Sequence, residues 1–120
     1  MKALTDLTER EVLALAIASE EEDSRIYRSF AEGLRADLPG SAGVFEAMAE
    51  EEAGHRDDLY AAYRQRFGEH LPPLRREDVK GFPRRRPVWW QGLDAARMRR
   101  EAQGMEAQAA AFYERAAELS

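Results

Sequence analysis

Apolar residues recur every three or four positions along three long stretches of the chain, which is the period of one face of an α-helix. The pattern predicts helices over about residues 8–36, 41–67 and 95–119. Thr8 and Glu11 have the spacing of a capping box at the start of the first helix. Because no stretch has the character of a strand, the sequence predicts an all-α helical bundle.

The connections between the predicted helices differ in length and composition. Asp37–Gly43 is predicted to form a turn, with Ser41 as the N-cap of the second helix, which stops at Gly68. Gly68–Pro87 holds four of the five prolines and is predicted to be a long crossover, after which Asp94 caps the third helix. The result is a bundle whose fourth helix is missing or comes from a partner chain.

The predicted inward faces of the helices contain ionisable residues. In the second helix the expected apolar positions read Phe45, Met48, Glu52, His55 and Leu59. The first helix places Tyr27 seven residues after Glu20, and the third helix repeats this spacing with Glu106 and Tyr113, which indicates two copies of one helical hairpin. The inward face of the third helix is predicted to be Met98, Ala102, Glu106, Ala109, Tyr113 and Ala116.

A metal ion would make these inward carboxylates tolerable, because an uncompensated charge among apolar side chains is costly. A Glu and a His three residues apart are neighbours on one helix face, and a Glu from an adjacent helix can bridge to a second ion. The candidate ligands are Glu20, Glu52, His55 and Glu106, with Glu51 as an alternate for Glu52. Tyr27 and Tyr113 are candidates to hydrogen-bond the ligating carboxylates.

The chemistry of this ligand set favours iron, with manganese or zinc as substitutes, since it offers carboxylates and imidazole but no soft ligand. Nearby acids, Glu21, Asp23 and Glu50 among them, are expected to guide cations inward. The alternative interpretation is a solvated Glu-rich helix face, because Glu-x-x-His is common on helices that bind no metal.

Composition narrows the classes of function. The chain has 120 residues and no Cys, which excludes disulfides, zinc ribbons and cysteine nucleophiles. Its net charge of −5 argues against nucleic-acid binding. The chain lacks an apolar run of about 18 residues and a signal-peptide pattern, so a cytoplasmic location is expected. His70 is predicted to be a loop histidine.

The predicted crossover is strongly basic. Arg75–Arg86 contains six Lys or Arg residues, and Trp89 and Trp90 follow closely. This combination suits the surface of an anionic membrane. It equally suits a solvated loop whose tryptophans cover the end of the bundle, and the sequence leaves both interpretations open.

The chain resembles the rubrerythrin and ferritin-like superfamily in three motifs. These are "ASEEEDSRIYRSFA" around Glu20 and Tyr27, "AEEEAGH" around Glu52 and His55, and "GMEAQAAAFY" around Glu106 and Tyr113. With the crossover included, the sequence is most similar to the ferritin-like domain of membrane-bound ferritin, which precedes a membrane domain of the vacuolar iron transporter type. The resemblance implies a di-iron site and a role in iron homeostasis: a ferroxidase-type oxidation or a sensing of ferrous iron, with oxygen or peroxide as reactant.

The given sequence departs from that family pattern because it shows one Glu-x-x-His helix and no membrane domain, so we expect a truncated ferritin-like domain over 1–120, either a fragment of a longer protein or a chain that a partner completes. A two-fold homodimer is expected to complete the ligand set with two copies of Glu20, Glu52 and His55, leaving Glu106 spare. Two other functions stay open. One is a rubrerythrin-like peroxidase with an external electron donor, and the other is a metal-free helical oligomerisation module.

Overall fold

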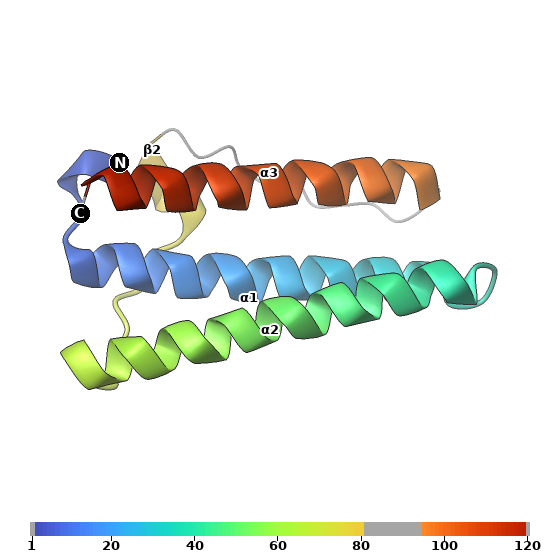
Figure 1. The fold of residues 1–120 in the computed structure, drawn as a ribbon, viewed down its shortest axis with the longest axis horizontal. Coiled ribbons are helices and arrows are strands. Elements are labelled where there is room, and N and C mark those ends of the chain that lie inside the picture. The colour runs from blue at the N-terminus through green and yellow to red at the C-terminus, as the bar shows by residue number, and fades with distance from the viewer. Residues whose placement is uncertain (1, 81–94, 120) are drawn as a thin grey trace.

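The computed structural model describes residues 2–80 and 95–119, and within them three long helices form the fold. They are α1 (Glu9–Leu34), α2 (Pro39–Phe67) and α3 (Ala95–Leu119). Helices α1 and α2 form an antiparallel hairpin, and α3 runs along the other side of α1 and antiparallel to it, as Figure 1 shows. The prediction of an all-α bundle is confirmed.

The capping residues of α1 and α2 explain where these helices begin and end. Thr8 and Glu11 form the predicted capping box at the start of α1. Helix α2 begins at Pro39, so the predicted N-cap Ser41 is wrong and lies inside the helix. Proline suits a first helical position because its missing N–H has no partner there. Gly68 ends α2 as predicted, with a φ of 87° that favours glycine.

The packing face of α3 differs from the predicted face. Met105 and Phe112 are buried, whereas Glu106 is exposed and Tyr113 is 38% exposed. The predicted face is therefore wrong by one position over this part of the helix. The larger apolar side chains gain more from burial than a carboxylate or a phenol does. Asp94, the predicted cap of α3, lies outside the described residues.

The largest cluster of buried apolar residues joins α1, the first half of α2 and α3. The rings of Phe30 and Phe45 meet edge to face at 5.3 Å, and Tyr27 stacks on Phe45 at 6.4 Å. Met98 and Met105 of α3 pack against the same cluster. A second cluster at the opposite end joins α1 and α3 to the crossover. Of the metal-site candidates, Glu20 lies between these two clusters along α1.

The first part of the crossover is ordered by short elements. A 3₁₀ turn, η2 (Arg76–Asp78), is followed by strand β2 (Val79–Lys80), which pairs in parallel with β1 (Lys2–Ala3); another 3₁₀ turn, η1 (Leu4–Asp6), precedes α1. The sequence pattern predicted no strand. This pair is only two residues long on each side, and the fold remains all-α.

The basic crossover is only partly described by the structure. Arg75 is exposed, as either interpretation of the crossover requires. Arg76 is only 7% exposed, so its charge is not available to bind an anionic membrane surface. Arg84, Arg85, Arg86, Trp89 and Trp90 lie outside the described residues. In the described ranges, none of the helices has the length and apolar character needed to cross a bilayer.

Candidate metal centre

Three of the predicted ligands meet in the structure. Glu20 comes from the middle of α1, and Glu52 and His55 come from adjacent turns of α2. The Nδ1 atom of His55 lies 3.7 Å from Glu20 Oε2 and 3.9 Å from Glu52 Oε2. One ligand atom from each residue lies within 4.8 Å of the other two. The helix spacing therefore places two carboxylates and one imidazole around one point.

A buried hydrogen bond fixes how α1 and α2 align at this level. Ser24, one turn after Glu20, donates its hydroxyl to the backbone oxygen of Ala49 at 2.9 Å, and Ala49 lies one turn before Glu52. Both groups are buried, so the bond is shielded from competing water. It holds the register in which the two carboxylates face each other.

The three side chains differ in exposure. Glu20 is 4% exposed and Glu52 is 7% exposed. The side chain of His55 is 51% exposed, so the prediction of an inward imidazole is wrong. His55 therefore lies at the solvent-exposed rim of the site. The site is closed on its carboxylate side and open toward solvent at the imidazole.

Among the residues that the structure describes, only His55 lies within ion-pair distance of the two buried carboxylates. Burial, and then the adjacent Glu20 carboxylate, raises the pKa of Glu52 to about 9. Glu20 Oε2 is buried and accepts no hydrogen bond from the N–H and O–H donors that the structure describes. Buried polar atoms without a partner are rare in folded proteins. The oxygen with no donor faces His55 and Glu52, which is where a cation would lie.

Two tyrosines connect the carboxylates of α1 and α3 in a crossed arrangement. Tyr27 of α1 donates its hydroxyl to Glu106 Oε1 at 2.8 Å, and Tyr113 of α3 donates to Glu20 Oε1. Burial, and then the partner carboxylate, raises the pKa of both tyrosines, so both remain donors. The repeated Glu and Tyr spacing in the sequence thus corresponds to reciprocal contacts between the two helices.

The remaining predicted ligands do not join the group of three. Glu106 is exposed and is held by Tyr27, on the side of α3 that faces α2. Glu51 is also exposed and lies outside the group. A ligand role for Glu106 remains a prediction. His70 lies in the loop after α2, as predicted, and its backbone oxygen accepts hydrogen bonds from Arg10 and Tyr63.

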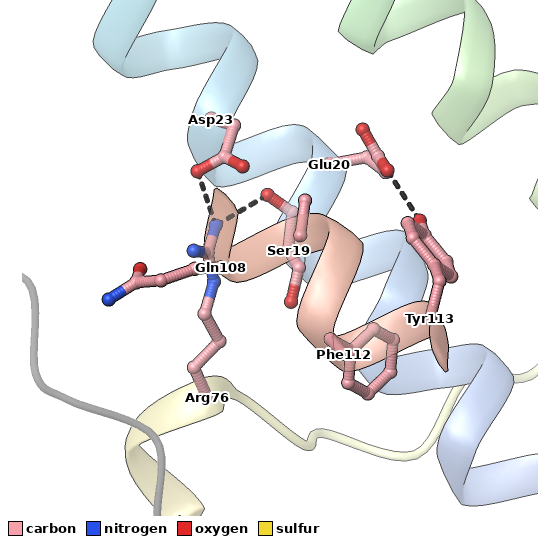
Figure 2. Close-up of a pocket in the computed structure, with 8 residues that line it drawn as sticks. Ser19, Glu20, Asp23, Arg76, Gln108, Phe112 and Tyr113 are labelled. Carbon is pink, nitrogen blue, oxygen red and sulfur yellow. Dashed lines mark hydrogen bonds and ion pairs between the residues drawn. The ribbon is translucent and has the colours of Figure 1, made fainter. Parts of the chain in front are cut away.

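A buried ion pair beside Glu20 escaped the sequence analysis. Arg76 Nη2 donates to Asp23 Oδ1 at 2.5 Å and to the backbone oxygen of Ser19 at 2.7 Å (Figure 2). Asp23 is 4% exposed, so it is not one of the solvated acids expected to guide cations. Arg76 lay in a run of basic residues, which gave no sign that one of them is buried.

Next to this ion pair is a cavity of about 10 Å³, lined by residues of α1, η2 and α3. The Ser19 hydroxyl and Arg76 Nε are buried there without hydrogen-bond partners among the described residues. A cavity of this size accommodates about one water molecule.

The rubrerythrin family model matches residues 11–120. The chain belongs to the rubrerythrin family. Comparison with curated proteins and comparison with solved structures each gave no match. The family match covers all three helices, and its ferritin-like architecture agrees with the bundle in Figure 1.

Iron fits the residues of this rubrerythrin-family chain. Two carboxylates and an imidazole, with no thiolate, are ligands that suit iron. A divalent cation would replace the proton that the raised pKa keeps on Glu52, and it would also contact Glu20 Oε2. The tyrosine hydroxyl on the other oxygen of Glu20 is the kind of outer contact that orients a metal ligand.

Proposed function

We propose that this chain binds ferrous iron at Glu20, Glu52 and His55 and promotes its oxidation, as a ferroxidase-type module of iron homeostasis. The observation that carries the proposal is the grouping of two buried carboxylates with an imidazole: one ligand atom each of Glu20, Glu52 and His55 lies within 4.8 Å of the other two.

The three residues have distinct roles in this proposal. Glu20 and Glu52 neutralise the cation in the closed part of the site, and Glu20 is oriented by Tyr113. His55 is the terminal ligand at the open rim, where ferrous iron and oxygen can enter from solvent. Two bound ferrous ions can together give two electrons to one dioxygen, which takes up two protons and leaves as hydrogen peroxide.

A pair of ions needs more ligands than these three. A groove of about 390 Å³ lies between α2 and α3, with Val44, Phe45, Met48 and Ala102 in its walls and Glu106 at its edge. Val44 is 60% exposed there. We infer that a fourth helix would lie in this groove, beside α2 and α3. We therefore propose a homodimer in which a second copy covers this face and supplies the remaining carboxylates and imidazole.

The cellular setting we propose is iron export or detoxification. The likeness of the sequence to the ferritin-like domain of membrane-bound ferritin supports this setting, and the exposed Arg75 is consistent with a nearby anionic membrane surface. Vesicle flotation with and without anionic lipid would test the membrane part of the proposal separately from iron binding.

The experiment that tests the proposal is anaerobic loading with ferrous iron, followed by desalting and measurement of metal per chain. We expect wild type to retain iron and His55→Ala and Glu52→Gln to lose most of it. His70→Ala and Glu51→Gln are the matched controls, because these residues are exposed and lie outside the site. Equal retention by His55→Ala and His70→Ala would contradict the proposal.

A second measurement follows oxygen consumption after ferrous iron is added. Wild type should consume oxygen faster than His55→Ala at equal iron. Turnover of hydrogen peroxide with a chemical reductant, without oxygen consumption, would instead assign the site to a peroxidase. Sedimentation at increasing protein concentration, with and without iron, tests the dimer, which a strictly monomeric iron-loaded protein would rule out.

A further inference from the structure

The Arg76–Asp23 pair lies beside Glu20: Arg76, Asp23 and Glu20 line the same small cavity. Arg76 Nη2 donates to the backbone oxygen of Ser19, the residue before Glu20. The same nitrogen donates to Asp23, one turn after Glu20. A single guanidinium nitrogen therefore contacts α1 one residue before and three residues after the candidate ligand Glu20.

Arg76 is itself held by packing. It comes from η2, and Val79 just beyond it is 1% exposed in a cluster with Leu15, Ala16 and Phe112. The parallel pairing of Lys2 with Val79 adds a backbone connection. Among the residues whose burial the structure describes, Arg76 is the only buried Lys or Arg. Charge-assisted hydrogen bonds from a buried, anchored guanidinium are strong and directional.

The same cluster also reaches the tyrosine that contacts Glu20. Gln108, Ala109, Phe112 and Tyr113 of α3 line the small cavity beside Arg76, as Figure 2 shows for the residues it labels. Arg76 therefore lies where the crossover, α1 and α3 meet. A shift of its guanidinium would move the turn that carries Glu20 relative to the helix that carries Tyr113.

We infer that Arg76 is a positioning residue of the metal centre: its contacts with Ser19 and Asp23 fix the turn of α1 that presents Glu20 to the ion. This inference rests on the proposed role of Glu20 as a ligand. Arg76 acts on the site by holding the backbone around Glu20 in place, and its guanidinium does not contact the candidate ligand atoms.

Geometry and charge predict opposite effects when Arg76 is removed. If only its charge mattered, Arg76→Gln would remove a cation near a cation site, and metal binding would become tighter. If Arg76 positions Glu20, the same change loosens the ligand turn and weakens binding. Outer contacts of metal ligands typically change metal affinity by about 10- to 100-fold. We expect a loss of that size.

The test is calorimetric titration of the full chain with Co²⁺, an air-stable probe, for wild type, Arg76→Gln and the double variant Arg76→Gln with Asp23→Asn. The double variant keeps the net charge and leaves no unpaired buried charge, so it is expected to fold if the single variant does not. Arg75→Gln is the matched control, because it changes the same charge one residue earlier in a side chain that is 77% exposed.

The expected result is weaker binding by at least about tenfold in the double variant, and in the single variant if it folds, with Arg75→Gln equal to wild type. Hydrogen exchange gives a second readout: metal should increase protection of the amides in residues 76–80 in wild type and not in the double variant. Unchanged or tighter Co²⁺ binding by the double variant would overturn the inference. A wild type that binds no metal would instead refute the proposed function, and the two failures are distinguishable.

Discussion

Replacement of Glu52 by glutamine should have opposite effects on the metal-free and the metal-loaded protein. Glu52 is 7% exposed, and burial together with Glu20 raises its pKa from 4.5 to about 9. In the metal-free fold this carboxyl keeps a proton that it would lose in the unfolded chain. Folding must then take up a proton, so stability falls as pH rises between about 4.5 and 9.

The size of the effect follows from the pKa change. Each pH unit in this window costs about 1.4 kcal/mol of unfolding free energy for one group. For an isolated carboxyl, the unfolding free energy lost between pH 4.5 and pH 7 would be about 3 kcal/mol. Because Glu20 shares the proton with Glu52, we expect a smaller loss of about 1–3 kcal/mol. Glutamine carries no titrating proton and retains the shape of the side chain. Glu52→Gln should therefore stabilise the metal-free protein at pH 7 and above, and the gain should shrink toward pH 5.

Urea unfolding in the presence of a chelator at several pH values measures this effect. Wild type should lose stability from pH 5.5 to pH 8, whereas Glu52→Gln should change much less. Glu51→Gln, an exposed neighbour, should follow wild type. With ferrous iron at about 100 times its dissociation constant, wild type should gain about 2.7 kcal/mol and Glu52→Gln should gain little. If the stabilities of wild type and Glu52→Gln change in parallel with pH, then Glu52 does not set the pH dependence of stability.

Three further predictions concern the surroundings of the site. Tyr113→Phe removes the hydroxyl bound to Glu20 and should weaken metal binding about tenfold, measured by Co²⁺ titration; unchanged affinity would contradict the role of this contact. Phe30→Ala empties a fully buried position among aromatic rings and should cost about 3–5 kcal/mol in urea unfolding; a cost below about 1 kcal/mol would contradict the core. Gly68→Ala forces a φ of 87° on a side chain and should cost about 1 kcal/mol, although the new Cβ has open space around it; a stabilised protein would contradict this backbone conformation.

The helices and the core of the candidate site follow from local sequence rules. A 3.6-residue period, a capping box at Thr8 and a glycine at the end of α2 are short-range signals, and each corresponds to a feature of the structure. The same periodicity placed Glu20 and Glu52 on buried faces. Helical spacing fixes which residues share a face, so it also predicted that His55 lies near them.

The features that the sequence did not predict depend on contacts between elements. The phase of α3 was misjudged because Met105 and Glu106 are adjacent, and only packing against α1 decides which one is buried. The exposure of His55 depends on what covers that face of α2. Arg76 is buried because η2 folds back onto α1, and no local pattern distinguishes it from the exposed Arg75.

Diffraction from crystals soaked with ferrous iron, recorded on both sides of the iron absorption edge, shows directly whether iron binds between α1 and α2 as we propose. We expect an anomalous peak within bonding distance of Glu20, Glu52 and His55, and none beside His70. An iron-soaked crystal without a peak among these three residues, while Glu20 and Glu52 remain buried, would contradict the proposal.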